Sequence, residues 1–190
     1  MASDFFYFLS SLPMLRFSGE GAPEVESFYR EVEQRLSGKE AGILRRLRLS
    51  PPVEPEAGDL EVPVISKWYQ WQIVMRNAMA ERRGRRLHME PSRYMRPALD
   101  AFPGDMKRLE VALELPTAAA RQDAWEELQW SFLEDLEGGC YFDFQAAVIY
   151  TLKLLLIAQR RRDKAVGSAH FEELMSSLLK QAGEHRRIVD

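Results

Sequence analysis

Arginines are the residues of this chain whose type and spacing could do chemistry. A guanidinium group presents a planar fork of donors that pairs well with carboxylates and phosphates. Arginines gather in two regions of the sequence, around 76–86 and at 160–162, and the first region also holds an asparagine. The candidates for docking onto an acidic surface of another protein are Arg76, Asn77, Arg82, Arg83, Arg85, Arg86, Arg160, Arg161 and Arg162.

The same arginines also fit a purely structural role or a nucleic-acid partner. Both clusters fall near the expected C-terminal ends of helices, where cations meet the partial negative charge of the helix dipole. Basic clusters can also bind nucleic acid. The net charge of −3 and the lack of a recognisable helix-turn-helix or RNA-binding motif argue against that partner. We therefore predict no nucleic acid as partner.

The residue types used in catalysis and metal binding are sparse. His88, His170 and His185 are far apart, and none forms the paired spacing that places two metal ligands on one helical face. Cys140 follows two glycines, and no base for it is identifiable, so we interpret it as an inert or half-buried thiol. No glycine-rich phosphate loop is present. The sequence predicts no catalytic, cofactor-binding or metal-binding residue and no cofactor.

Two further groups of charged residues have structural interpretations. The acids of one expected helix fall largely off its apolar seam, which predicts a solvated face: Glu126, Glu127, Glu134, Asp135 and Glu137. Lys153 stands inside an apolar run, where a lysine extends its amine past its neighbours or pairs with a carboxylate.

That apolar run is the element around which the other helices must pack. From Ala146 to Ala158 only Thr151 and Lys153 interrupt the apolar side chains, so the sequence predicts a buried central helix at 143–162. A bilayer span needs roughly 20 apolar residues, and this run is shorter, so we predict no membrane span.

Helical periodicity recurs through the rest of the chain, and no convincing strand alternation is found after residue 17. We expect an all-α, compact helical bundle in which helices at 67–83, 118–137 and 168–184 contact the central helix. Ser66, Asp105, Thr117 and Asp143 are the expected N-caps. Gly138, Gly139 and Gly167 are expected to end helices, and a helix near 43–49 precedes the prolines.

Prolines and acids between residues 51 and 63 divide the chain. We predict an N-terminal aromatic segment and helical hairpin at 1–50, a proline-rich linker at 51–63 and a main helical domain at 64–190. The aromatic segment 5–17 fits either a strand or a helical turn. It is expected either to tuck into the core or to offer an exposed aromatic contact surface.

Composition is ordinary for a folded protein, with 46% apolar and 29% charged residues. One cysteine permits no internal disulfide, and the N-terminus lacks the positive region of a secretory signal. We expect a cytoplasmic protein.

Three segments together resemble a known bacterial family: FFYFLSSLPMLRF at 5–17, WYQWQIVMRNAMAERR at 68–83 and FDFQAAVIYTLKLLLIAQRRRDKAVGSAHF at 142–171. It is a family of domain-of-unknown-function type whose genes sit among those for V-type ATP synthase subunits. The resemblance covers most of the chain, although its motifs are helical patterns without catalytic residues.

The resemblance implies a non-catalytic accessory or coupling subunit of a V-type ATP synthase or ATPase, which transports protons or sodium ions. It implies a short counterpart of the C (d) subunit, the socket between central stalk and membrane ring, with V-type subunits as partners. The chain would then lie at the inner membrane only through that complex. The C (d) subunit is considerably longer, which puts a complete socket in doubt. The alternatives are a free-standing helical enzyme and a nucleic-acid-associated helical protein.

Overall fold

The computed structural model describes residues 2–140 and 143–189, with side chains described for 6–56, 58–140 and 143–167. Every regular element within these residues is helical, which confirms the predicted all-α fold. The elements are α1 (Ala2–Ser11), α2 (Val25–Arg35), α3 (Gly38–Arg46), α4 (Ala57–Leu60), α5 (Pro63–Leu87), the 3₁₀ helix η1 (Pro91–Tyr94), α6 (Pro103–Leu113), α7 (Ala118–Glu137) and α8 (Phe144–Val189).

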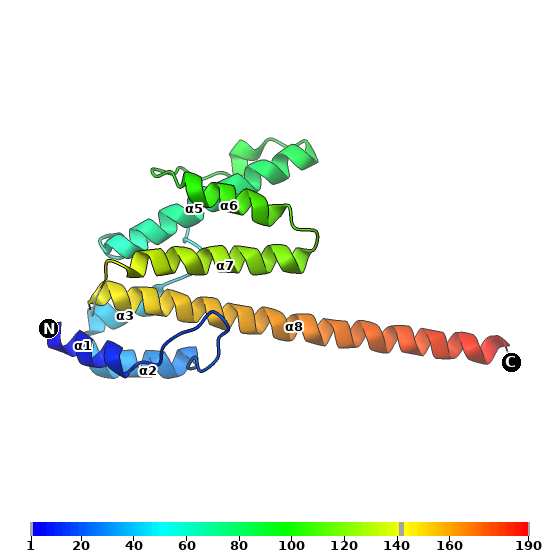
Figure 1. Ribbon diagram of the computed structural model, residues 1–190, viewed down its shortest axis with the longest axis horizontal. Helices are drawn as coiled ribbons and strands as arrows, with labels where there is room; N and C mark the ends of the chain where they lie inside the picture. The colour runs from blue at the N-terminus through cyan, green and yellow to red at the C-terminus, as the bar shows by residue number, and fades with distance from the viewer. Residues whose placement is uncertain (1, 141–142, 190) are drawn as a thin grey trace.

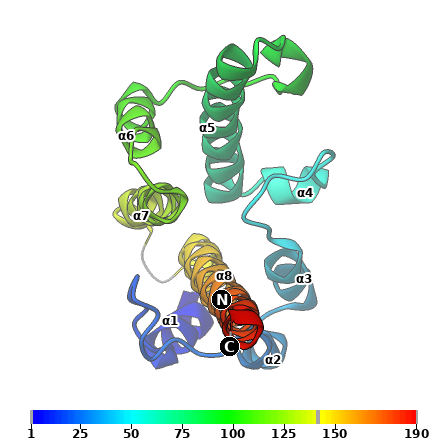
Figure 2. The same ribbon diagram turned by 90° about the vertical axis from the view of Figure 1, so that its right-hand side faces the viewer.

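The first half of α8 is the axis of the fold, and other helices surround it (Figure 1). Figure 2, which looks along α8, shows α1 and α2 on one side and α7 with α5 on the other. The helices that contact α8 are α1, α2, α3, α5 and α7. Helix α6 packs on α7 and α5, and η1 packs on α5.

The core position of α8 follows from its apolar run. Ala147, Val148, Ile149 and Leu152 are fully buried, which confirms a buried central helix. The predicted bounds of 143–162 are wrong, because burial ends at Ile157 and the helix continues beyond 162. The two polar interruptions are both accommodated: the hydroxyl of Thr151 donates to the carbonyl of Ala147 at 2.7 Å. Lys153 Nζ pairs with Glu137 Oε2 at 2.6 Å and lies 5.1 Å from the ring centre of Trp130. A buried ammonium group is tolerated because it is paired.

The prediction of a separate last helix at 168–184 is wrong, because α8 continues unbroken to Val189 over 46 residues. Positive φ among the described glycines occurs only at Gly19 and Gly21, so Gly167 keeps helical geometry. A glycine inside a helix costs only about 1 kcal/mol relative to alanine, too little to stop a long helix. The contact expected between the central helix and 168–184 is therefore a continuation of one helix.

Several helix ends also differ from expectation. Helix α3 starts at Gly38 instead of residue 43 because Ser37 and Glu40 form a reciprocal capping box. Helix α5 starts at Pro63, a residue suited to a first helical position, so Ser66 lies inside the helix. Gly138 follows α7 with a φ of −59°, so it needs no left-handed geometry.

The predicted caps of α7 and α8 are confirmed. The hydroxyl of Thr117 accepts from the backbone N–H of Ala120 at 3.1 Å, and Asp143 Oδ1 accepts from Ala146 at 2.9 Å. Asp105 has another role: its carboxylate accepts from Trp71 Nε1 at 2.8 Å. Trp71 in turn stacks on Phe132 with ring centres 4.7 Å apart, so Asp105 satisfies the polar atom of a core aromatic cluster.

Residues 5–17, whose conformation the sequence left open, contribute helix α1 up to Ser11 and an irregular segment after it. Phe8 and Leu15 are buried, whereas Phe6 and Tyr7 are exposed. The segment is therefore partly tucked into the core and partly a surface.

The proline-rich segment 51–63 is bonded to arginines of the elements around it. Arg46 Nη2 pairs with the buried Asp59 at 2.7 Å, and Arg96 donates to the carbonyls of Pro51 and Pro52 at 3.1 and 2.9 Å. The buried residues on both sides of the segment belong to one hydrophobic cluster. The division into 1–50, 51–63 and 64–190 stays a prediction.

Candidate docking surfaces

The first two candidate residues, Arg76 and Asn77, are bonded within the chain. Arg76 donates to the hydroxyl of Ser50 at 2.7 Å and to Gln72 at 3.3 Å, and burial lowers the pKa of its guanidinium. Asn77 donates to the carbonyl of Arg96 at 2.7 Å and accepts from the N–H of Arg96 at 3.0 Å. Both side chains thus fasten neighbouring loops to the middle of α5.

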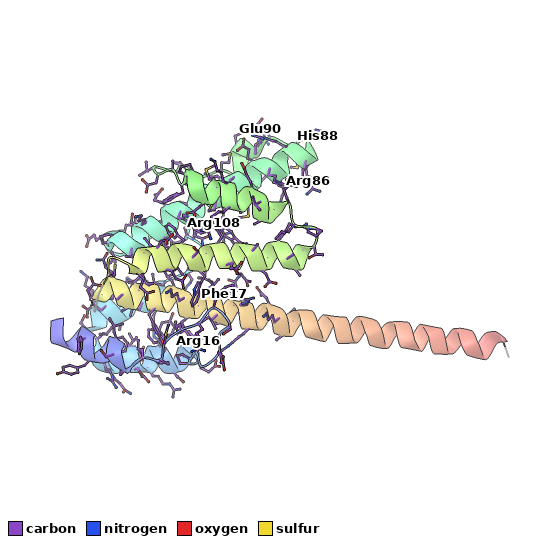
Figure 3. All side chains as sticks on the ribbon, viewed as in Figure 1. Arg16, Phe17, Arg86, His88, Glu90 and Arg108 are labelled. Atoms are coloured by element: carbon purple, nitrogen blue, oxygen red, sulfur yellow. The ribbon has the colours of Figure 1, made fainter. Side chains whose placement is uncertain are left out.

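The four arginines at the end of α5 divide into two pairs. Arg82 pairs with Glu114 at 2.7 Å, and Arg85 pairs with Glu81 one turn earlier on α5. Arg83 and Arg86 are exposed and form no ion pair with a described residue. Figure 3 shows Arg86 with His88 and Glu90 at this end of α5. Among these four arginines, Arg83 and Arg86 are therefore the two without a carboxylate partner in the described part of the chain.

A groove of about 430 Å³ lies beside these residues, between the end of α5 and the turn from α6 to α7. We name it the arginine groove. Its lining combines arginines with apolar side chains: Met79, Arg82, Arg83, Arg86, Leu87, Leu113 and Arg121.

Arg121 is a member of the arginine groove that the sequence analysis missed. It reaches the groove because α7 begins directly after the turn at 114–117, which returns the chain toward α5. Its guanidinium donates to the carbonyls of Leu115 and Pro116 at 2.6 and 3.3 Å, which fixes its position. The only sequence signal for this placement was the tight turn marked by Pro116 and Thr117.

A second, smaller hollow of about 250 Å³ lies on the other side of Arg83 and Leu87. Its lining is mostly apolar: Ala80, Arg83, Gly84, Leu87, Met89, Glu90, Pro91 and Tyr94. Leu87, Met89 and Tyr94 remain 59%, 51% and 65% exposed. The end of α5 thus combines free positive charge with exposed apolar surface.

The assignment of Arg160, Arg161 and Arg162 to a helix C-terminus is wrong, because these residues lie in the middle of α8. Arg160 pairs with Asp123 at 3.0 Å and with Glu126 at 3.4 Å, and it lies 4.1 Å from the ring centre of Phe17. Glu126 is buried, so its predicted place on a solvated face is also wrong.

Arg161 holds the segment before α2 against α8. It donates to the carbonyls of Gly19 and Ala22 at 2.6 and 3.2 Å. A Cβ at Gly19, where φ is +80°, would lie 3.0 Å from Ile157, so this close approach requires glycine. Figure 3 places Phe17 of the same segment next to α8. Arg160 and Arg161 are therefore engaged internally, and Arg162 alone of the three is exposed without an ion pair to a described residue.

Of the cysteine and the three histidines of the chain, the structure describes the side chains of Cys140 and His88. Burial, helped by the nearby carboxylates of Asp143 and Glu137, raises the pKa of the Cys140 thiol and so favours its unreactive neutral form. His88 is exposed, and the side chains of His170 and His185 lie outside the described residues. No group of three potential metal ligands is found in the described part of the chain.

The second half of α8 is a further surface. Residues 161–167 are all exposed, and Figure 1 shows the helix continuing well beyond the body formed by the other helices. By sequence, Phe171, Leu174, Leu178 and Ala182 recur on one face of this half, although their side chains lie outside the described set. Within the described residues, no helix is long and apolar enough to cross a membrane.

The chain matches no protein-family model, no curated protein and no solved structure. Its relation to the V-type family therefore stays a prediction carried by the three sequence segments.

Proposed function

We propose that this chain is a non-catalytic helical subunit that joins or assembles other proteins, and that its partners are subunits of a V-type ATP synthase or ATPase. The observation that carries the proposal is the second half of α8, which leaves the body as a single unaccompanied helix (Figure 1). The resemblance of segments 5–17, 68–83 and 142–171 supplies the identity of the partners.

The physical argument concerns the stability of a lone helix. Isolated helices shorter than about 12–15 residues are marginal in water, and longer ones gain most of their stability by packing an apolar face. The sequence places Phe171, Leu174 and Leu178 on one face of the projecting half. A partner helix that covers this stripe would stabilise it, and the rigid first half of α8 would transmit load to the body. We infer that α8 is the coupling element.

The test is co-purification of the tagged full-length chain from its own cells. In Leu174→Ser/Leu178→Ser, two members of the apolar stripe become polar without a change in charge. The matched control Glu173→Ser/Lys180→Ser changes two residues on the opposite face and also keeps the net charge. We expect V-type subunits with the wild type and the control, and roughly tenfold less of them with the double leucine variant, a loss of about 1.4 kcal/mol.

Two results would contradict the proposal. One is a wild-type preparation from native cells that contains no component of a rotary ATPase. The other is turnover of a substrate by the isolated chain, which would favour the free-standing enzyme instead.

A further inference from the structure

The arginine groove carries a surplus of positive charge that the described carboxylates do not neutralise. Of its four guanidinium groups, only Arg82 has a carboxylate partner among the described residues, Glu114. Arg121 donates to neutral backbone carbonyls, and Arg83 and Arg86 form no ion pair with a described residue. No aspartate or glutamate lines the groove within the described side chains. An anionic ligand would therefore find unshared donors here.

The helix dipole accounts for only part of this arrangement. Cations in the last turn of α5 meet the partial negative charge of its carbonyls, which explains Arg85 and Arg86. It does not explain why Met79, Leu87 and Leu113 form the rest of the lining. Apolar side chains beside free arginines are instead typical of a protein-binding surface, where arginine is enriched and the centre of the contact is apolar.

The neighbouring surface extends the apolar part of this site. The smaller hollow shares Arg83 and Leu87 with the arginine groove, and it adds Met89 and Tyr94, both more than half exposed. Contiguous exposed apolar surface on a folded chain is typical of a site that a partner covers. A ligand seated across Leu87 would cover both hollows.

The charges around the groove favour one of two anionic partners, an acidic protein segment, over the other, a nucleic acid. On the other side of Arg82 lies a hollow whose lining includes the carboxylates of Glu81, Glu110 and Glu114. A nucleic acid needs a continuous basic track for its phosphates, and these carboxylates would repel it. A short segment avoids these carboxylates if its own carboxylates lie over the arginine groove and its apolar side chains lie over the smaller hollow, where Glu90 is the one acidic residue in the described lining.

We propose that the arginine groove binds an acidic amphipathic helix or peptide segment of a partner protein, with carboxylates on Arg83 and Arg86 and apolar side chains on Leu87 and its neighbours. This inference rests on the proposed function because it takes the partner to be a protein. The inference adds to that function the charge and the amphipathic character of the partner segment that binds the body of the protein.

The test measures binding of synthetic peptides to the full-length chain by fluorescence anisotropy. The probe is a peptide of about 16 residues, roughly four helical turns, with leucines at helical spacing on one face and glutamates on the other. A peptide with the same composition in scrambled order removes the amphipathic face, and a peptide with lysine in place of glutamate reverses the charge. A single-stranded oligonucleotide of equal negative charge represents nucleic acid. We expect only the first peptide to bind well, with an affinity that falls as salt rises.

Variants then locate the binding on the protein. Arg83→Glu/Arg86→Glu should weaken the affinity for the acidic amphipathic peptide by roughly tenfold or more, and Leu87→Ser should weaken it without a change in charge. The matched control is Arg35→Glu/Lys39→Glu, the same charge reversal at exposed residues of α2 and α3. The control should bind like the wild type, and all variants should keep the wild-type circular dichroism.

Equal binding of the scrambled peptide, tighter binding of the oligonucleotide, or no effect of Arg83→Glu/Arg86→Glu would overturn the inference. These failures are distinguishable from failure of the proposed function. If V-type subunits co-purify with the wild type while the peptides do not bind, the inference about the groove is wrong and the proposed function stands. If the peptides bind as expected and nothing of a V-type ATPase co-purifies, the groove is supported and the proposed partner is wrong.

Discussion

Charged side chains are buried in this molecule where an opposite charge meets them. The ammonium group of Lys153 has Glu137, and the carboxylate of Glu126 has Arg160. Removal of one partner from such a pair leaves a charge that is costly to bury. For Lys153, which interrupts an apolar run, pairing with a carboxylate was one of the two interpretations that the sequence allowed. It did not anticipate burial of Glu126, because the residue that faces it lies on another helix.

The apolar residues of α8 differ in how much they contribute to the free energy of unfolding. Leu152 is fully buried, so Leu152→Ala should lower that free energy by about 2–5 kcal/mol, measured by chemical denaturation. Leu155 is only partly buried, so Leu155→Ala should lower the free energy of unfolding by less. Val166→Ala on the same helix is the control: Val166 is 64% exposed, and its truncation should change stability by less than about 0.5 kcal/mol. Equal losses at Leu152 and Val166 would contradict the burial of the first half of α8.

Tyr150 gives the molecule a dependence on alkaline pH. Burial raises its pKa to about 12, and its hydroxyl donates to the carbonyl of Pro13 at 3.1 Å. An unfolded tyrosine ionises near pH 10, so the unfolded state loses the proton first. The stability contributed by neutral Tyr150 is fully present below about pH 10 and is lost as pH rises from about 10 to 12.

Urea denaturation at about pH 8 and about pH 11, on either side of the ordinary tyrosine pKa, measures this effect. The wild type should lose more stability between the two values than Tyr150→Phe, which cannot ionise. Some loss should remain in the variant, because burial also raises the pKa of Tyr29 and Tyr69. The exposed Tyr7→Phe should behave like the wild type, and identical slopes for all three proteins would contradict the argument.

At the scale of elements, one substitution tests whether α8 is continuous. Gly167→Ala should raise helix stability if the helix continues through Gly167 and lower it if the helix ends there. In a continuous helix, Gly167→Ala should stabilise the helix locally by about 0.5–1 kcal/mol, and nothing described lies within 4 Å of the added Cβ. If Gly167 instead ended the helix with a positive φ, alanine would destabilise it. Hydrogen exchange of the amides near residue 167 distinguishes the two results.

Gly84→Ala in α5 is the matched control for that substitution. Its Cβ would lie 3.0 Å from the carbonyl oxygen of Met89 and from Pro91, so alanine should destabilise the end of α5. Stabilisation at Gly84 would show that η1 packs on α5 more loosely than these distances require.

The elements also show how far sequence reasoning reaches. Thr117 and Asp143 were predictable as caps because a cap depends on residues within one turn. Gly167 was misinterpreted because a glycine signals a stop only when the following residues leave the helix. Arg83 and Arg86 were correctly placed near the end of a helix. Arg121 was missed because the turn that returns α7 to α5 is a tertiary feature, which single-helix patterns do not encode.

At the scale of the whole molecule, a helix of 46 residues at 1.5 Å per residue is about 69 Å long, which exceeds what the surrounding helices cover. The last buried apolar residue described on α8 is Ile157, and residues 161–167 are exposed. The described core therefore lies in the body, and under the proposed function the projecting half of α8 is the part that contacts a partner.

Removal of residues 168–190 tests this division. The shortened chain should keep the melting temperature of the full chain within about 2 °C, because no described core residue is lost, measured by circular dichroism. Small-angle scattering should show a longest dimension reduced by about 33 Å, the length of roughly 22 helical residues. A chain ending at 150 is the destabilised reference, since it lacks Leu152, Leu154 and Leu156 of the core. If removal of 168–190 instead lowers the melting temperature by about 10 °C or more, roughly 2.5–5 kcal/mol for a domain of this size, those residues pack against the body and α8 does not project from it.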